Sequence, residues 1–188
     1  MSGFVVRDPS PIVSNWRADS SLEEELVKSD VVGICDLDTR ALTRHLRDRG
    51  AMRVGIFSGE NLSREEMVQK VRNSSLMKGA YLAEDVSVTE PEIIAATGTK
   101  RFRVAALDLG IKDATPKNLS RRGIETTLLP VRTSFSTIRD AGFDGLFLSN
   151  GPGDPATMDD VVALVRDALD QSMPTFGICF GHQILGRA

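Results

Sequence analysis

The residues best suited to chemistry lie in the segment 177–183 (GICFGHQ). Cys179 stands between two glycines, each two positions away, and the segment 174–178 (PTFGI), which reads as a strand, leads into it. A nucleophile flanked in this way, between a buried strand and a helix, is typical of a nucleophile elbow. The turn strains the backbone of the nucleophile, and larger side chains at the glycine positions would collide. The pattern therefore predicts that Cys179 is a nucleophile on a tight turn.

The surroundings of the thiol decide whether it can react. Cysteine attacks as the thiolate, and the N-terminal end of a helix favours negative charge. We therefore expect the sulfur of Cys179 to lie above the sheet edge in its reactive form. The alternative is a buried cysteine in a core strand, but the paired glycines favour the elbow. Cys35 has no such surroundings, because it ends the apolar segment 31–35, and we expect it to pack in a core.

Acyl transfer also needs hydrogen-bond donors for the oxyanion of the tetrahedral intermediate. The backbone N–H of Phe180 is one candidate. The loop 150–155 (NGPGDP) is a second source, because Gly151 and Gly153 allow a ligand to approach the backbone closely. In a parallel sheet both loops would emerge at the carboxyl edge, where ligands bind. A plain turn is the alternative for this loop.

A regular alternation of strands and helices positions these residues. Strands are predicted at residues 104–109, 125–131, 145–149 and 174–178, and helices at 116–122, 134–141 and 158–169. Short apolar strands separated by helices indicate a parallel sheet covered on both faces. Right-handed crossovers then favour a doubly wound arrangement.

The earlier part of the chain gives mixed signals. Strands are predicted at residues 31–35 and 54–57, and helices after a Ser20 cap, over 39–49 after Asp38 or Thr39, and from a Ser63–Glu66 capping box. A short polar linker separates this part from the regular alternation. We therefore predict an α/β chain with a smaller mixed α/β domain over residues 1–97 and a doubly wound, mainly parallel domain over residues 101–188.

Composition excludes several classes of protein. The chain has 188 residues and a formal net charge of −3, with no clustered basic face of the kind that nucleic-acid-binding domains carry. Two separate cysteines argue against a zinc site or a disulfide framework, so no metal site is expected. No apolar run approaches the roughly 18–20 residues of a membrane span, and no secretory signal is visible. We expect a cytoplasmic protein.

The loop 150–155, followed by the segment 177–183, resembles the class I glutamine amidotransferases. Within that group the NGPGDP form is similar to the small subunit of carbamoyl phosphate synthetase. Residues 36–47 (DLDTRALTRHLR), 5–8 (VVRD) and 14–16 (SNW) are similar to the N-terminal domain of the same subunit. The resemblance implies a flavodoxin-like sheet for the second domain.

The resemblance also implies a reaction and a partner. Cys179 would attack the side-chain amide of glutamine, release ammonia and form a glutamyl thioester that water hydrolyses. Gly151, Gly153 and Phe180 would contact glutamine or the oxyanion through backbone atoms, and Gln183 would help to hold the substrate. This chain would need no cofactor. A large synthetase subunit would use the ammonia with bicarbonate, ATP and Mg to make carbamoyl phosphate for arginine and pyrimidine synthesis.

The chain departs from the family pattern at its ends. The family's activating histidine and its glutamate lie far beyond the elbow, whereas this sequence ends at Ala188, so it resembles a fragment without the C-terminal part and the extreme N-terminal part. We expect neither His45 nor His182 to replace the base. The chain alone is therefore predicted to be inactive, with an unpaired sheet edge and uncovered apolar surface.

Three other functions stay open. The chain could belong to a glutamine-hydrolysing subunit of another pathway, although the residues around Thr39 argue for carbamoyl phosphate synthesis. It could be a non-catalytic, partner-binding module of the same fold, or a cysteine hydrolase that acts on another amide or ester.

Overall fold

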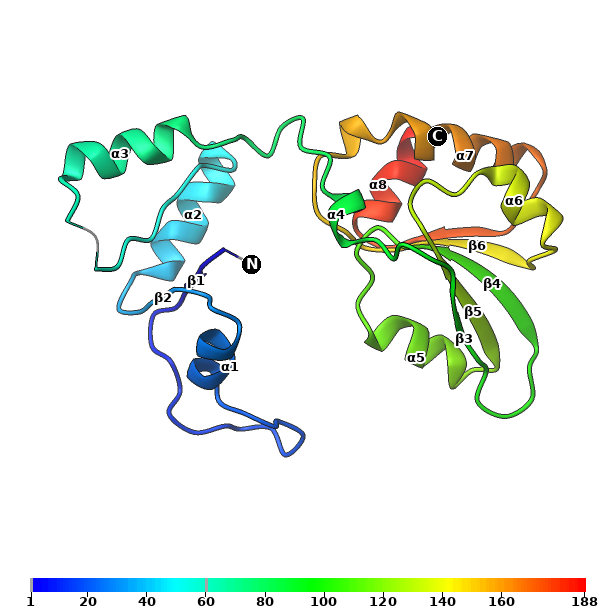
Figure 1. Ribbon diagram of the computed structural model, residues 1–188, viewed down its shortest axis with the longest axis horizontal. Coiled ribbons are helices and arrows are strands. Elements are labelled where there is room, and N and C mark those ends of the chain that lie inside the picture. The colour runs from blue at the N-terminus through cyan, green and yellow to red at the C-terminus, as the bar shows by residue number, and fades with distance from the viewer. Residues whose placement is uncertain (1, 60) are drawn as a thin grey trace. The chain divides into compact units, whose positions relative to one another are not determined.

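The computed structural model describes residues 2–59 and 61–188, which form two compact units (Figure 1). One unit ends at Ser75 and the other runs from Leu76 to Ala188. The boundary lies earlier than the predicted linker at residues 97–101, because the strand β3 (Glu92–Ile94) pairs with β5 (Ile124–Leu129) in the second unit. The predicted domains, 1–97 and 101–188, therefore do not coincide with the two compact units, and the division into these domains stays a prediction.

The first unit contains three helices and one short parallel pair of strands among its described residues. The strands are β1 (Phe4–Val5) and β2 (Gly33–Ile34), and the helices are α1 (Leu22–Lys28), α2 (Thr39–Arg49) and α3 (Arg64–Asn73). Local caps set the helix starts: Ser21 with Glu24 and Ser63 with Glu66 form capping boxes, and Asp38 caps α2.

The second unit is built on a sheet with strand order β3-β5-β4-β6-β7. The strands β4 (Phe102–Leu107), β5, β6 (Gly145–Leu148) and β7 (Thr175–Gly177) run parallel, and only β3 is antiparallel. The connecting helices are α4 (Ala83–Val86), α5 (Ala114–Ser120), α6 (Phe135–Asp140), the 3-10 turn η1 (Pro155–Thr157), α7 (Asp159–Asp170) and α8 (Phe180–Arg187). This arrangement confirms the predicted α/β class with a mainly parallel sheet.

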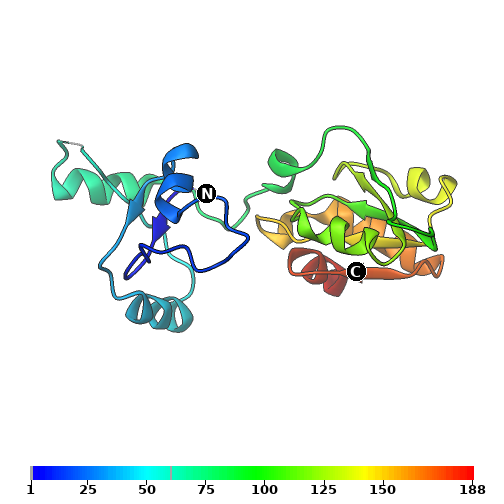
Figure 2. The ribbon, with the colours of Figure 1, turned by 90° about the horizontal axis from the view of Figure 1, so that it is seen from below.

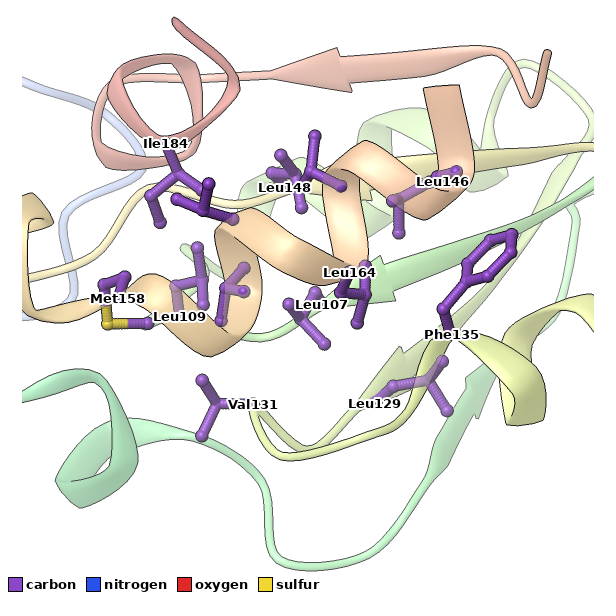
Figure 3. Packing of buried hydrophobic residues seen from close by; sticks show 14 of the residues in the cluster. Leu107, Leu109, Leu129, Val131, Phe135, Leu146, Leu148, Met158, Leu164 and Ile184 are labelled. Atoms are coloured by element: carbon purple, nitrogen blue, oxygen red, sulfur yellow. The ribbon is translucent and has the colours of Figure 1, made fainter. Parts of the chain in front are cut away.

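Helices cover both faces of this sheet, but unequally. The helices α6, α7 and α8 lie on one face and α5 on the other, and α5 stands in front of the sheet in Figure 2. The larger core lies under α7 and α8, where Leu107, Leu148 and Ile184 are fully buried (Figure 3). This core anchors α8, and therefore the start of the helix that follows Cys179.

Several predictions of local structure are wrong. Residues 54–57 form no strand, and Gly55 instead packs against Phe57 and Val71. Cys35 is exposed rather than buried, because the short β1–β2 pair presents its surroundings to solvent. The cap of α1 is Ser21, and the Ser20 hydroxyl donates to Glu25 instead. The elements β3 and α4 were not predicted.

Candidate active site

The turn between β7 and α8 has the geometry of a nucleophile elbow. Cys179 precedes α8 with φ 54° and ψ −110°, a backbone conformation that costs about 1–3 kcal/mol for a residue other than glycine. Such strain persists only where the surrounding structure imposes it. The predicted tight turn is therefore present, while the role of Cys179 as nucleophile stays a prediction.

The two glycines of the elbow leave no space for a side chain. An ideal Cβ on Gly177 would lie 2.6 Å from the carbonyl atoms of Gly181. A Cβ on Gly181 would lie 2.3 Å from the Leu148 carbonyl oxygen, at the end of β6. Real Cβ atoms do not approach other atoms this closely, so the close packing of β6, β7 and α8 requires glycine at both positions.

The elbow separates an exposed thiol from a buried anchor. Cys179 is exposed, whereas the neighbouring Phe180 side chain is 3% exposed and packs in the larger core. Gln183 and His182 are exposed on α8. The thiol is thus accessible to a ligand, and the helix start behind it is held by an aromatic ring.

Sheet pairing brings the glycine loop next to the elbow. The strands β6 and β7 are parallel neighbours, with Leu148 opposite Gly177. The Ile178 N–H donates to the Leu148 carbonyl at 3.1 Å, so both chains leave the sheet side by side. Gly151 and Gly153 lie on the loop after β6, and Cys179 lies on the turn after β7. The sequence prediction that these loops share one sheet edge therefore agrees with the strand order.

Several backbone N–H groups at this edge have no acceptor. In α8 the Gly181 N–H donates to Ser149 and the Gln183 N–H donates to Cys179, both at 3.0 Å. Within the described part of the chain, nothing accepts the N–H groups of Phe180, Gly151 or Gly153. A free donor on the residue after an exposed thiol is what oxyanion stabilisation needs, and the free N–H groups of Gly151 and Gly153 lie on the loop after the neighbouring strand.

Sequence reasoning missed the contacts of residues 79–80, near the start of the second unit, with the glycine loop. The Asp154 carboxylate accepts the Gly79 N–H at 2.8 Å and the Ala156 N–H at 2.9 Å. The Asp154 N–H donates to the Ala80 carbonyl at 2.9 Å. Hydrogen bonds from Gly79 and then Ala156 hold the pKa of Asp154 below its ordinary value. Asp154 of the NGPGDP segment therefore fixes the end of the loop. Its contact with Gly79 joins residues that are distant in the sequence, so no local pattern predicts it.

The described residues contain no complete catalytic triad. His182 lies on α8 and His45 on α2 of the first unit, and neither forms a hydrogen bond with a carboxylate in the described ranges. Residues 2–59 and 61–188 also contain no group of three or more His, Cys, Asp or Glu side chains that could hold a metal ion. No helix among the same residues is long and apolar enough to cross a membrane.

Comparisons with known proteins match the chain to two family models. A model of the class I glutamine amidotransferases matches residues 105–188, and a model of the CPSase domain of the carbamoyl-phosphate synthase small chain matches residues 1–56. The carbamoyl phosphate synthase small chain of Mycolicibacterium paratuberculosis is 56% identical over the whole of this chain. Over its whole length the chain is therefore similar to carbamoyl phosphate synthase small chains. Similar proteins of the same name from Streptomyces avermitilis and Corynebacterium efficiens are 55% and 50% identical, again over the whole chain.

This chain spans about half the length of these carbamoyl phosphate synthase small chains. It covers 51%, 50% and 48% of the three relatives from M. paratuberculosis, S. avermitilis and C. efficiens. Residues 57–104, which include α3 and the unpredicted β3, lie between the two matched family models. The elbow and the glycine loop both fall within the amidotransferase match.

Proposed function

We propose that this chain carries the glutamine-binding loop and the nucleophile of a glutamine-hydrolysing subunit of carbamoyl phosphate synthase. The observation that carries the proposal is the strained, exposed Cys179, at the start of α8 and beside a loop with free N–H groups. The family match at residues 1–56 supports carbamoyl phosphate synthesis over another pathway.

The chemistry follows from this arrangement. The Cys179 sulfur forms a bond to the side-chain amide carbon of glutamine, and the carbonyl oxygen gains negative charge. The N–H of Phe180 and those of Gly151 and Gly153 donate to the oxyanion or to the substrate, and Gln183 helps to hold glutamine. The amide nitrogen takes a proton and leaves as ammonia. Water then cleaves the thioester to glutamate and restores the thiol.

The wider role is part of the same proposal. A large synthetase subunit receives the ammonia and combines it with bicarbonate, with ATP and Mg as its own requirements. The product, carbamoyl phosphate, supplies arginine and pyrimidine synthesis. A thiol nucleophile has to stay reduced, which fits a cytoplasmic location.

Selective labelling of the thiol tests the proposal. A chloroketone analogue of L-glutamine forms a thioether with a positioned thiolate and releases chloride. We expect Cys179 to react with this analogue at least about tenfold faster than with its D-enantiomer, because a site that binds L-glutamine orients only the L-form for attack. Peptide mass spectrometry follows Cys179 and the exposed Cys35 in the same sample, and Cys35 should show no preference.

Two variants make the result specific. Cys179→Ser should abolish the selective reaction, whereas Cys35→Ser should leave it unchanged. Equal rates for the two enantiomers at Cys179 would instead favour a partner-binding module of the same fold. To test turnover, this chain can replace the matching half of the M. paratuberculosis relative. We expect glutamate release from that hybrid and none from the 188-residue chain, because His45 and His182 are its only histidines.

A further inference from the structure

A pair of polar side chains at the end of β6 joins the glycine loop to the turn after β4. Ser149 is 0% exposed. Its hydroxyl accepts the Leu109 N–H at 2.9 Å and donates to the Asn150 carbonyl at 2.8 Å. The Asn150 side-chain amide donates to the Gly110 carbonyl at 2.7 Å. Each residue therefore connects two loops that are far apart in the sequence.

The two loops are in direct backbone contact. An ideal Cβ on Gly151 would lie 2.0 Å from the Leu109 carbonyl oxygen. Gly110 has φ 117°, and a Cβ there would lie 3.0 Å from Pro152. Because the backbones touch, the position of the turn after β4 sets the position of Gly151.

A buried carboxylate in turn fixes the turn after β4. Asp108 is 3% exposed, and it accepts the N–H groups of Gly110 at 2.9 Å and Ile111 at 2.8 Å with one oxygen. Its other oxygen accepts the Val88 N–H at 2.9 Å. A buried carboxyl group that accepts three N–H groups is well satisfied, so these hydrogen bonds hold the turn that supports the loop beside it.

The same pair also reaches the elbow. The Ser149 carbonyl accepts the Gly181 N–H at 3.0 Å, in the first turn of α8. Ser149 therefore bonds to the turn after β4 through its side chain and to the elbow helix through its backbone. The glycine loop is held between these two supports.

We propose that Ser149 and Asn150 are positioning residues for glutamine hydrolysis. They fix the position of the glycine loop relative to the sheet edge. The N–H groups of Gly151 and Gly153 can then donate to the substrate carbonyl that Cys179 attacks. This inference rests on the proposed function. Neither side chain touches the substrate, and both act through the backbone of the loop. Small displacements of such donors strongly reduce the stabilisation of developing charge.

The test uses Asn150→Ala and Asn150→Asp in the 188-residue chain. The second variant keeps the shape of the side chain but replaces the amide NH2 group by a carboxylate oxygen. This oxygen cannot donate a hydrogen bond to the Gly110 carbonyl. Asn118→Ala is the matched control, because Asn118 is exposed on α5 and no hydrogen bond of its side chain is found among the described residues. Ser149→Ala is a further variant, and thermal melting checks that each chain folds.

The first measurement is hydrogen exchange in peptides that cover the glycine loop and the turn after β4, where the hydrogen-bonded N–H groups of Leu109, Ile111 and Asp154 report on both loops. Loss of one hydrogen bond should speed the exchange of the loop about two- to tenfold. Exchange in α7 should not change. The Asn118→Ala chain should match the original chain throughout.

The second measurement is labelling of Cys179 by the glutamine chloroketone and by iodoacetamide. Iodoacetamide needs only an accessible thiolate, so its rate should stay within about twofold of the original chain. The maximal rate with the chloroketone should fall at least about tenfold. Its half-saturating concentration should change less, because the variants displace donors to the developing charge.

Every outcome bears on the inference. Faster loop exchange together with a selective loss of chloroketone labelling supports it. Unchanged loop exchange overturns it, and so does faster exchange with unchanged chloroketone labelling. Loss of iodoacetamide labelling as well would show general unfolding of the elbow rather than positioning, and would also overturn it. If the original chain shows no preference for the L-analogue, the proposed function itself fails, which is a separate result.

Discussion

The two units of the chain differ in what holds their elements in place. In the first unit no described residue is buried, yet α1 and α3 have complete capping boxes. In the second unit a continuous core of fully buried side chains runs from β4 to α8. Helices in the first unit therefore depend on local hydrogen bonds at their starts, whereas the elements of the second depend on packing between distant segments.

Truncation of a large apolar side chain should give the largest difference between the two units in lost free energy of unfolding. Ile184 of α8 is 0% exposed and Leu46 of α2 is 36% exposed. Ile184→Ala should lower the free energy of unfolding of the second unit by about 2–5 kcal/mol, through lost burial and a cavity. Leu46→Ala should change the first unit by less than about 1 kcal/mol. Urea unfolding followed by hydrogen exchange in each unit measures both, and equal losses would contradict the contrast.

Removal of a helix cap should instead destabilise the first unit, whose helices depend on local hydrogen bonds. The Ser63 hydroxyl accepts the Glu66 N–H at 3.3 Å, and the Glu66 carboxylate accepts the Ser63 N–H at 2.8 Å. Ser63→Ala should destabilise α3 by about 1 kcal/mol, since an N-cap is lost. The exposed Ser58 provides a control through Ser58→Ala. Carbon chemical shifts in α3 report the change, and an unaltered α3 in the Ser63 variant would show that the cap is unimportant.

Acidification should give the smallest effect. Hydrogen bonds with Ser21 lower the pKa of Glu24, first through the backbone, and those with Ser63 lower the pKa of Glu66, first through the side chain. A carboxyl whose folded pKa is depressed contributes stability above its unfolded pKa and loses it as pH falls through the folded value. The first turns of α1 and α3 should therefore fray as pH falls below the ordinary value of 4.5.

Helical chemical shifts measured from neutral pH to about pH 3 follow this fraying. The double variant Glu24→Gln, Glu66→Gln keeps oxygen acceptors but cannot titrate in this range, so its helices should lose the pH dependence. Fraying of the same size in that variant would assign the effect to other groups.

This contrast explains what the sequence could predict. The helices α2 and α3 were placed correctly, because Asp38, Ser63 and Glu66 are local signals within one turn. The four parallel strands were found: β6 and the end of β4 are apolar runs of the kind that buried strands form, whereas β5 and β7 contain threonine and were recognised by their places between predicted helices. The strand predicted at residues 54–57 failed, since strand formation depends on a partner that the local sequence does not reveal.

The candidate site shows the same division. The elbow was predictable because the two glycines flank Cys179 at a fixed spacing, although the collision that requires Gly181 is with the Leu148 carbonyl on β6. The contacts of Asp154 with Gly79 and of Asn150 with Gly110 were not predictable, because they join segments that only the folded sheet brings together. The exposure of Cys35 was misjudged for the same reason: an apolar run gives no information on whether another layer covers it.

Phe180 has one further consequence for how such a site can change. Its ring belongs to the core, while its free N–H belongs to the peptide backbone. A main-chain donor survives every substitution except proline. Evolution or design at this position can therefore adjust the direction of the donor, by altering how the ring is seated, but cannot readily delete it. The backbone donor at the elbow is therefore kept in most point mutants of Phe180. The packing of the side chain in the core sets the direction of that donor.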